Sequence, residues 1–477
     1  MPSLSERYRA AREELARFGQ EHVLAFWDRL ADSQRAQLLD DIGQIDLARC
    51  AALVETHVRR KPAVHVPASI EPPDVFPADP DADRLSLYQE ARRAGVAAIR
   101  AGRVAAFTVA GGQGTRLGFA GPKGAFAISP VRNATLFQLF AESLRGVERR
   151  YGCRPRWYIM TSLTNHDQTL QFFAENGFFG LSADEVFFFR QGQMPAFLPD
   201  GRIALTEMHR VALSPDGHGG SLRALASSGA LEDMRRRGID VISYFQVDNP
   251  LVRVIDPLFI GLHLLNGSEM SSKAVHKAYD TERVGVFCLI DGRLGVIEYS
   301  DLPNELAKAR NPDGSRRFDA GSIAIHIIDR AFVERLTAPG ATVQLPWHRA
   351  EKKVNTVDEQ GRAVVPEIPN AVKLEMFVFD AIPLARNPLV LYTHRQEEFS
   401  PVKNADGVDS PATAKRDMIR RAARWLESCG ATVPRGADGE PAMPLEISPA
   451  YALDVEDLHE RLHEPVHLTP GRPFLLA

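Results

Sequence analysis

A glycine-rich stretch with two cations beside it is the part of this sequence best suited to chemistry. Residues 109–118 read Val-Ala-Gly-Gly-Gln-Gly-Thr-Arg-Leu-Gly, and Pro122-Lys123 follows shortly after. Glycine lets a backbone approach a ligand closely and turn its amide N–H groups toward it. Arg116 and Lys123 can then balance negative charge. The stretch predicts a loop that wraps phosphates, with an ordinary tight turn as the alternative.

The loop matches neither of two common phosphate-binding motifs. A Walker loop requires Lys-Ser/Thr after its last glycine, whereas Gly118 is followed by Phe119. A dinucleotide-binding fingerprint requires a third Gly or Ala at the position of Leu117. The sequence therefore points to a different class of phosphate-binding protein.

Asp248 and a second glycine-rich loop are further candidates. Asp248 directly follows the apolar run Val241–Val247. A carboxylate at the end of a buried strand can hold Mg²⁺ beside a phosphate, and a helix cap or turn is the alternative. The loop Pro215–Gly220 precedes a helix expected over 221–228, whose N-terminus would favour an anion or a polar ligand edge. Taken alone, this second loop could equally be a turn.

Alternating strands and helices are expected to position these groups. Strands are predicted over 104–109, 156–161, 186–189 and 239–247, and helices over 135–150, 165–175 and 256–265. This order predicts an α/β fold in which helices cover both faces of a mainly parallel or mixed sheet. Ligands in such folds bind at the carboxyl ends of strands, where the first glycine-rich loop and Asp248 are both expected.

The remaining segments suggest a three-part chain. Residues 1–60 have helical spacing, and Lys61–Pro80 carries six prolines, which indicates an extended connector. Residues 284–299 predict a hairpin around Asp291-Gly292, and 412–427 predict a helix. We expect a helical N-terminal lobe with its connector over 1–95, a central domain over 96–384 and a small C-terminal domain over 385–477.

Composition excludes several classes of protein. The formal net charge of −4 argues against a large nucleic-acid surface. The four cysteines lie far apart and form no Cys-x-x-Cys pair, which fits a reducing compartment. The N-terminus lacks an apolar signal core, and no run of 18 apolar residues predicts a membrane span. A cytoplasmic location is expected, with no nucleic-acid or membrane partner.

An ordered series of motifs resembles one known family. The chain resembles the eukaryotic-type UDP-sugar pyrophosphorylases and is most similar to those for UDP-N-acetylglucosamine or UDP-N-acetylhexosamine. The matching segments run in order along nearly the whole chain: 19–27, 111–118, 122–123, 191–196, 212–220, 247–249, 296–300, 318–324, 373–380 and 399–404. Single motifs are weak, but this order is specific.

The resemblance implies a Rossmann-like nucleotidyltransferase domain, with a mixed sheet flanked by helices, between smaller terminal domains. The family joins UTP to a hexosamine 1-phosphate and releases pyrophosphate, with Mg²⁺ as cofactor. Three cations, Arg116, Lys123 and Lys403, would hold phosphates, and Asp248 would bind the metal. The uridine would be held by Ala110, Gly111, Gly112, Gln191 and Gly217. The sugar pocket would include Glu298, Phe377 and Phe379.

Two departures from the family pattern fall in the sugar region. The family has Asn at the position of His218, and its Asn-Ala-Gly-Asn-Ile is here Asp319-Ala-Gly-Ser322-Ile323. Amides in both motifs are expected to contact sugar hydroxyls and the N-acetyl group. N-acetylglucosamine 1-phosphate is the first expectation. Glucose 1-phosphate, galactose 1-phosphate, another amino sugar or a broad specificity are the alternatives.

Two other functions remain open at this point. A non-catalytic UDP-sugar binding or regulatory protein could share the fold, although it would not need charge placed for a departing pyrophosphate. A nucleotidyltransferase for another base is a second possibility, which Gln191 and the close backbone near Ala110 disfavour because they suit a small pyrimidine.

Overall fold

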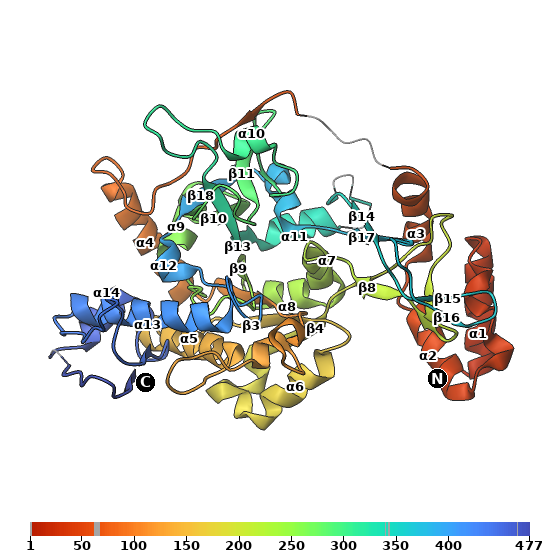
Figure 1. The fold of residues 1–477 in the computed structure, drawn as a ribbon, viewed down its shortest axis with the longest axis horizontal. Helices are drawn as coiled ribbons and strands as arrows, with labels where there is room; N and C mark the ends of the chain where they lie inside the picture. The colour runs from red at the N-terminus through yellow and green to blue at the C-terminus, as the bar shows by residue number, and fades with distance from the viewer. Residues whose placement is uncertain (1, 62–66, 339, 342–343, 465) are drawn as a thin grey trace. The chain divides into compact units, whose positions relative to one another are not determined.

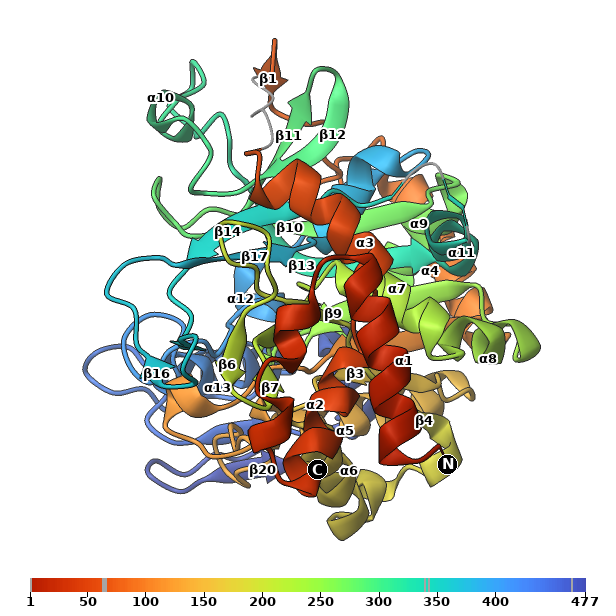
Figure 2. The ribbon, with the colours of Figure 1, turned by 90° about the vertical axis from the view of Figure 1, so that its right-hand side faces the viewer.

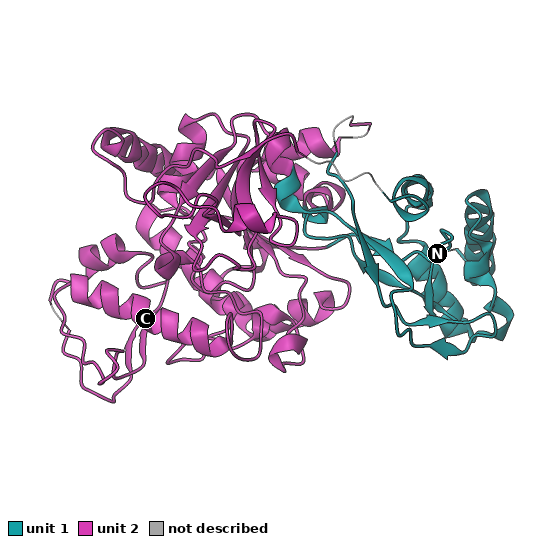
Figure 3. Cartoon of the chain, turned by 45° about the horizontal axis from the view of Figure 1, so that its top comes forward, with its two compact units in different colours: residues 1–66, 191–221, 344–380 teal, residues 67–190, 222–343, 381–477 magenta. Residues whose placement is uncertain are grey.

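The structure is a computed structural model that describes residues 2–61, 67–338, 340–341, 344–464 and 466–477. The chain divides into two compact units (Figure 3). The first unit comprises Met1–Val66, Gln191–Ser221 and Gln344–Asp380, and the second comprises Pro67–Arg190, Leu222–Val343 and Ala381–Ala477. The predicted division at residues 95 and 384 stays a prediction.

A mixed sheet forms the centre of the second unit (Figure 1). Its main path runs β1-β11-β13-β9-β2-β3-β4, with β10 and β18 joined to β13, and β12 joined to β11. The segment β9-β2-β3-β4 is parallel, and β13 runs antiparallel to β9. The strand bounds are β1 Ile70–Glu71, β2 Val104–Val109, β3 Trp157–Thr161, β4 Val186–Arg190, β9 Val241–Gln246, β10 Met270–His276, β11 Val286–Ile290, β12 Arg293–Ile297, β13 Ala320–Asp329 and β18 Leu389–Tyr392.

Helices cover both faces of this sheet. The parallel strands are mostly apolar, as is typical of strands that are covered on both faces. Trp157 and Ile159 of β3 belong to the core that contains residues of α4, α5, α6 and α9. Tyr158 points to the other face, where its hydroxyl donates to Asp233 of α8 at 2.7 Å. The helix bounds are α4 Leu85–Arg100, α5 Leu136–Tyr151, α6 His166–Glu175, α8 Ala230–Arg236, α9 Pro257–Leu265, α10 Asn304–Ala307, α11 Arg330–Thr337, α12 Arg395–Glu398, α13 Pro411–Ser428 and α14 Val455–Arg461.

Helices α4 and α9 approach each other so closely that only glycine fits between them (Figure 1). A Cβ added at Gly95 would lie 1.8 Å from the carbonyl oxygen of Pro257, and one added at Gly261 would lie 1.7 Å from that of Ala91. The sequence pattern did not predict α4, β10 or β13.

A second, smaller core lies near the C-terminus of the same unit. It joins α13 with the strands β19, Leu445–Ile447, and β20, Phe474–Leu476. Trp425 and Leu426 of α13 are buried in it. The predicted helix over 412–427 is therefore confirmed, with α13 as its counterpart.

The first unit combines N-terminal helices with short strand pairs from later in the chain. Helices α1 and α2 lie side by side (Figure 2). They bury a common apolar core with the strand β5 and with β17. The bounds are α1 Leu4–Arg17, α2 Asp32–Ile42, α3 Leu47–Leu53, β5 Gln193–Pro195, β6 Leu205–Glu207, β7 Arg210–Val211, β8 Leu213–Pro215, β14 His348–Lys352, β15 Thr356–Val357, β16 Ala363–Val364 and β17 Ala371–Glu375. The boundary between the two units falls within the helix α7, Gly220–Ser227, since Ser221 belongs to the first unit and Leu222 to the second.

The predicted α/β class with a mixed sheet is confirmed, together with the predicted helical pattern near the N-terminus. Every predicted strand and helix of the 104–265 region has a counterpart within a few residues. The hairpin expected around Asp291-Gly292 is β11–β12. Residues 62–66 of the predicted connector lie outside the described residues, and β1 lies in the rest of it. No described helix combines the length and apolar character needed to cross a bilayer.

Candidate active site

The first glycine-rich loop begins where β2 ends and is held by a buried asparagine. Ala110 is fully buried, and its amide donates to the carbonyl of Met160 at 2.7 Å. The side-chain amide of Asn165 donates to the carbonyl oxygens of Ala110 at 2.9 Å and Gly112 at 3.2 Å. Asn165 is itself fully buried. Because it occupies these two carbonyls, it sets the course of the loop. No motif in the sequence pointed to this role of Asn165.

The predicted cation segment is attached to the same loop. The Lys123 amide donates to the Gly112 carbonyl at 3.0 Å, and the Gly114 amide donates to the Gly121 carbonyl at 2.9 Å. Gly118 has a φ of +70° at the end of the 3-10 turn Thr115–Leu117, a conformation that favours glycine. Arg116 is exposed on this turn and makes no hydrogen bond or ion pair with any residue that the structure describes. Its guanidinium is therefore available to an anion.

Asp248 lies at the neighbouring strand end. β2 and β9 are parallel, with Val109 opposite Gln246, and the Val247 amide donates to the Val109 carbonyl at 3.1 Å. Asp248 thus leaves the sheet beside Ala110, as predicted. Its carboxylate is half-buried and has no hydrogen bond or ion pair within the described part of the chain. A partly desolvated carboxylate without a protein cation suits a bound metal ion.

The segment that carries Lys403 joins the loop and the strand end. The Val402 amide donates to the main-chain carbonyl of Asp248 at 2.8 Å. Lys123 Nζ donates to the Val402 carbonyl at 3.3 Å. Lys403 Nζ lies 3.8 Å from the carboxylate of Asp409. The structure therefore brings three predicted residues, Lys123, Asp248 and Lys403, to one place in the second unit.

Asp409 is a carboxylate near this site that the sequence analysis did not identify. Burial raises the pKa of Asp409, Lys403 opposes that shift, and the negative charges of Glu282 and Asp248 raise the pKa further. The charge of Asp248 therefore acts on Asp409, so the two carboxylates belong to the same region of the second unit.

Asn249, next to Asp248, clamps the chain that leads to Lys403. Its side-chain amide donates to the Glu398 carbonyl at 2.6 Å, and its side-chain oxygen accepts the Ser400 amide at 3.2 Å. The Glu398 carboxylate is in turn held by Lys273 Nζ, at 2.7 Å from Oε1. Both charged side chains are almost completely buried. No motif signalled Lys273 or Glu398, because their pairing depends on the sheet.

Two predicted sugar residues, Glu298 and Ser322, both lie beside Gly285 in the second unit. The Ser322 amide donates to the Gly285 carbonyl at 2.7 Å. A Cβ added at Gly285 would lie 3.3 Å from Glu298 Oε1, so the carboxylate covers this glycine. Asp319, the third predicted residue of this region, lies 2.6 Å from the His276 ring and also accepts the Lys277 amide at 3.1 Å. Its carboxylate is therefore already engaged by protein groups.

The predicted uridine residues Gln191 and Gly217 contact each other in the first unit. Gln191 Nε2 donates to the Gly217 carbonyl at 2.7 Å and to Asp216 Oδ1 at 3.3 Å. Burial raises the pKa of Asp216 to about 6, although the Gln191 hydrogen bond opposes the shift. Gly217 has a φ of +84°, and a Cβ added there would lie 2.3 Å from the Met376 carbonyl oxygen. This loop can therefore lie against the chain before Phe377 only because position 217 is glycine.

His218 lies in an aromatic cluster with the two predicted phenylalanines. Its ring centroid is 5.3 Å from that of Phe377 and 5.7 Å from that of Phe379. Its Nδ1 accepts the main-chain N–H of Val378 at 3.1 Å. Burial lowers the pKa of His218 to about 4, and the nearby His348 adds to the shift. The ring is therefore neutral at pH 7, and its proton is on Nε2, which is a hydrogen-bond donor.

The predicted site residues thus fall in both units. The second unit holds Ala110, Gly111, Gly112, Arg116, Lys123, Asp248, Glu298, Asp319, Ser322 and Lys403. The first holds Gln191, Gly217, His218, Phe377 and Phe379. Among the residues that the structure describes, no three or more His, Cys, Asp or Glu side chains form a metal-binding group. A metal at Asp248 would therefore need ligands from substrate and water, as Mg²⁺ commonly has.

The neutral state of His218 predicts a pH-dependent stability. The pKa of this group is about 4 in the folded chain and about 6.5 when unfolded. As the pH falls from 6.5 toward 4, the unfolded state therefore binds a proton at this side chain and the folded state does not. We expect wild type to lose about 1–2 kcal/mol of unfolding free energy relative to His218→Asn between pH 7.5 and pH 5. Urea unfolding at both pH values measures the difference in unfolding free energy between wild type and His218→Asn. His463→Asn, at an exposed position, is the control, and its difference from wild type should not change between the two pH values. If the difference between wild type and His218→Asn did not change either, the neutral state of His218 would be contradicted.

Comparison with known proteins assigns the chain to a family. The model of the UTP–glucose-1-phosphate uridylyltransferase family matches residues 70–413. Human UDP-N-acetylhexosamine pyrophosphorylase-like protein 1 is 39% identical, over 94% of this chain and 93% of the relative. UDP-N-acetylglucosamine diphosphorylase 2 of Arabidopsis thaliana is 35% identical, over 96% of this chain and 92% of the relative.

A solved structure agrees with these matches. The uridine diphosphate N-acetylglucosamine pyrophosphorylase of Trypanosoma brucei, in complex with an inhibitor, has a TM-score of 0.82 at 26% identity. The match covers 100% of this chain and 99% of that one. The resemblance inferred from the motifs is confirmed, and the chain belongs to the UTP–glucose-1-phosphate uridylyltransferase family.

Proposed function

We propose that this chain transfers a uridylyl group from UTP to a sugar 1-phosphate, with N-acetylglucosamine 1-phosphate as the preferred acceptor. The products are the UDP-sugar and pyrophosphate. The human relative is named for UDP-N-acetylhexosamine and the Arabidopsis relative for UDP-N-acetylglucosamine, which supports a UDP-N-acetylhexosamine product here. We place the reaction in the cytoplasm.

One observation carries the proposal. The main-chain carbonyl of Val402 accepts from Lys123 Nζ, and its amide donates to the Asp248 carbonyl. A cation of the glycine-rich loop, the carboxylate at the strand end and the segment of Lys403 therefore meet at Val402. Arg116 extends from the same loop without a protein partner among the residues described. Such an arrangement suits a triphosphate better than an uncharged ligand.

The chemical difficulty of this reaction is electrostatic. The acceptor phosphate is already an anion at neutral pH, so it attacks the α-phosphorus of UTP in line without a general base. Two like unit charges 4 Å apart repel by about 4 kcal/mol at an effective dielectric constant of about 20. Several such pairs would prevent the encounter. Arg116, Lys123 and Lys403 would offset the repulsion and align the two substrates.

Mg²⁺ fits the proposed site. Asp248 would hold it, since its half-buried carboxylate has no cation partner in the described chain and the charge of Asp409 acts on the same region. When bound, the ion would supply positive charge to the phosphates of UTP. The main chain holds the segment of Lys403 against Asp248, which places Lys403 near the reacting phosphates. We therefore expect Lys403 to contribute more to turnover than to nucleotide binding.

The remaining predicted residues would bind the base and the sugar. In the second unit, we propose the backbone of Ala110–Gly112 for the uridine and Glu298 for the sugar. In the first unit, we propose Gln191 and Gly217 for the uridine, and Phe377 and Phe379 for the sugar.

His218 can replace an asparagine in one respect. Its neutral ring keeps one N–H donor on Nε2 after Nδ1 has accepted the Val378 amide. We propose that this donor contacts the sugar or its N-acetyl carbonyl. Asp319 and Ser322 would complete the sugar contacts, the Asp319 carboxylate through lone pairs that the His276 ring and the Lys277 amide leave unused. Glucose 1-phosphate and galactose 1-phosphate are the alternative acceptors because Ser322 is shorter than the family asparagine.

Asp248→Asn tests the metal role. The substitution keeps the size of the side chain and removes its charge. We expect turnover to fall by about 10²-fold or more at saturating Mg²⁺, as when a key electrostatic group is lost. Steady-state release of pyrophosphate measures the effect. The exposed Asp313 gives the matched control, Asp313→Asn, for which wild-type rates are expected. Near-normal turnover of Asp248→Asn would exclude Asp248 as the metal ligand.

A substrate panel tests the proposed function itself. Pyrophosphate release is followed with UTP and each of three acceptors: the 1-phosphates of N-acetylglucosamine, glucose and galactose. We expect the highest kcat/KM for N-acetylglucosamine 1-phosphate, and we expect ATP, CTP and GTP to replace UTP poorly.

The other outcomes of the panel are equally informative. A preference for glucose 1-phosphate would replace the proposed acceptor and leave the reaction class intact. Tight binding of UDP-sugars without pyrophosphate release from any acceptor would instead identify a non-catalytic binding protein.

A further inference from the structure

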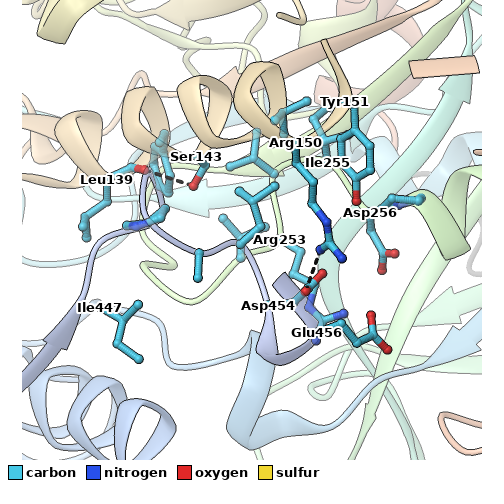
Figure 4. Close-up of a pocket in the computed structure, with 18 of the residues that line it drawn as sticks. Leu139, Ser143, Arg150, Tyr151, Arg253, Ile255, Asp256, Ile447, Asp454 and Glu456 are labelled. Carbon is cyan, nitrogen blue, oxygen red and sulfur yellow. Dashed lines mark hydrogen bonds and ion pairs between the residues drawn. The ribbon is translucent and has the colours of Figure 1, made fainter. Parts of the chain in front are cut away.

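A cavity of about 470 Å³ lies inside the second unit (Figure 4). Its walls come from α4, α5, residues 250–257, α13 and the segment 447–460. It contains none of the residues assigned above to UTP, sugar or metal. The function proposed above therefore leaves this cavity unexplained.

The acidic side chains of the cavity already have cationic partners. Glu456 pairs with Arg92 at 3.0 Å. Asp454 pairs with Arg150 at 2.7 Å, as the dashed line in Figure 4 shows. Asp256 pairs with Lys273 at 2.6 Å. These carboxylates are neutralised and need no ligand.

Two arginines of the lining keep N–H donors that have no acceptor among the described residues, although the charges of Glu398, Asp256 and Asp454 raise the pKa of Arg253. Arg253 has no hydrogen bond among the described residues, and its nearest carboxylate, that of Glu398, is 3.8 Å away. That same carboxylate is already held by Lys273. Within the described chain, Arg421 donates only to the main-chain carbonyls of Leu251 and Glu397, each at 3.1 Å. Both guanidiniums line the cavity, and both keep unused N–H donors.

The two arginines also act on each other. Burial lowers the pKa of Arg421 to about 10, and the charge of Arg253 acts in the same direction. Like charges held together in a partly desolvated site repel each other, and an anion placed between them would turn that repulsion into attraction.

The rest of the lining is apolar and aromatic. Trp425 lies beneath the Arg421 guanidinium, whose carbon is 5.2 Å from the ring centroid. Phe140, Val147 and Tyr151 line the cavity from α5. Such walls suit the body of a small organic molecule and not a bare inorganic ion.

We propose that this cavity binds a small organic phosphate monoester, with its phosphate between Arg253 and Arg421 and its apolar body against Trp425 and α5. A guanidinium fork matches phosphate oxygens, and a dianion compensates two arginines better than a monoanion does. The cavity wall at 250–257 follows Asp248 and Asn249 directly in the chain. A ligand there would contact a segment continuous with the proposed metal site.

Calorimetric titration of the full-length protein with phenyl phosphate tests the proposal. We expect saturable binding, and at least about tenfold weaker binding of benzoate, which carries a single charge. Arg253→Gln and Arg421→Gln should each weaken phenyl phosphate binding by about tenfold or more. Arg12→Gln, which removes an exposed arginine of α1, is the matched control, and its affinity should equal that of wild type. Arg116→Gln reports any binding of the probe at the glycine-rich loop.

The same titration can overturn the proposal. No measurable binding to wild type would do so. Weakening by Arg116→Gln together with unchanged affinity in Arg253→Gln would also do so, because the probe would then occupy the proposed UTP site. A crystal of the wild-type protein soaked in phenyl phosphate guards against misfolding of the variants. Density between Arg253 and Arg421 supports the cavity site, and density confined to the glycine-rich loop contradicts it.

Discussion

The hydrogen bond from the Val402 amide to the Asp248 carbonyl is the contact on which the proposed chemistry depends. It ties the end of a central strand to a segment more than 150 residues later in the chain. Lys123 completes the junction through the Val402 carbonyl. Because the contacts are made mainly by backbone, they position Asp248 and Lys403 without engaging the Asp248 carboxylate. Lys403 Nζ lies 3.8 Å from the Asp409 carboxylate, so its ammonium group can still turn toward a substrate phosphate.

A cluster of buried charged side chains stabilises the segment that contains Val402. Lys273 lies between Asp256 and Glu398, and burial alone would raise the pKa of Asp256. The charges of Lys273 and Arg253 outweigh burial, so the pKa of Asp256 is lowered instead. Losing one partner of such a group leaves an uncompensated buried charge, which typically costs about 3–5 kcal/mol. The ion pair of Glu398 with Lys273 therefore fixes the start of the segment 398–403. Asn249, next to Asp248, donates to the Glu398 carbonyl and so links this segment to the end of β9.

Local patterns in the sequence predicted the parallel strands, the glycine-rich loop and the position of Asp248. Each of these depends on residues adjacent in the chain, such as an apolar run followed by a carboxylate. The partners of Lys273 and Asn249 could not be predicted in this way, because Glu398 is brought to them by the pairing of β10 with β18 and by the course of the chain beyond it. The long strand β13 was missed because it mixes polar and apolar residues and carries Ala324 at a φ of +54°.

A crystal structure of the protein with UTP and Mg²⁺ would show whether the nucleotide and the metal bind where we propose. We expect triphosphate density against the backbone amides of the loop that begins at Ala110. We also expect a metal ion in direct contact with the Asp248 carboxylate, and Arg116 turned toward a phosphate. Triphosphate bound elsewhere, or a metal ion coordinated without Asp248, would show that the proposed site is wrong.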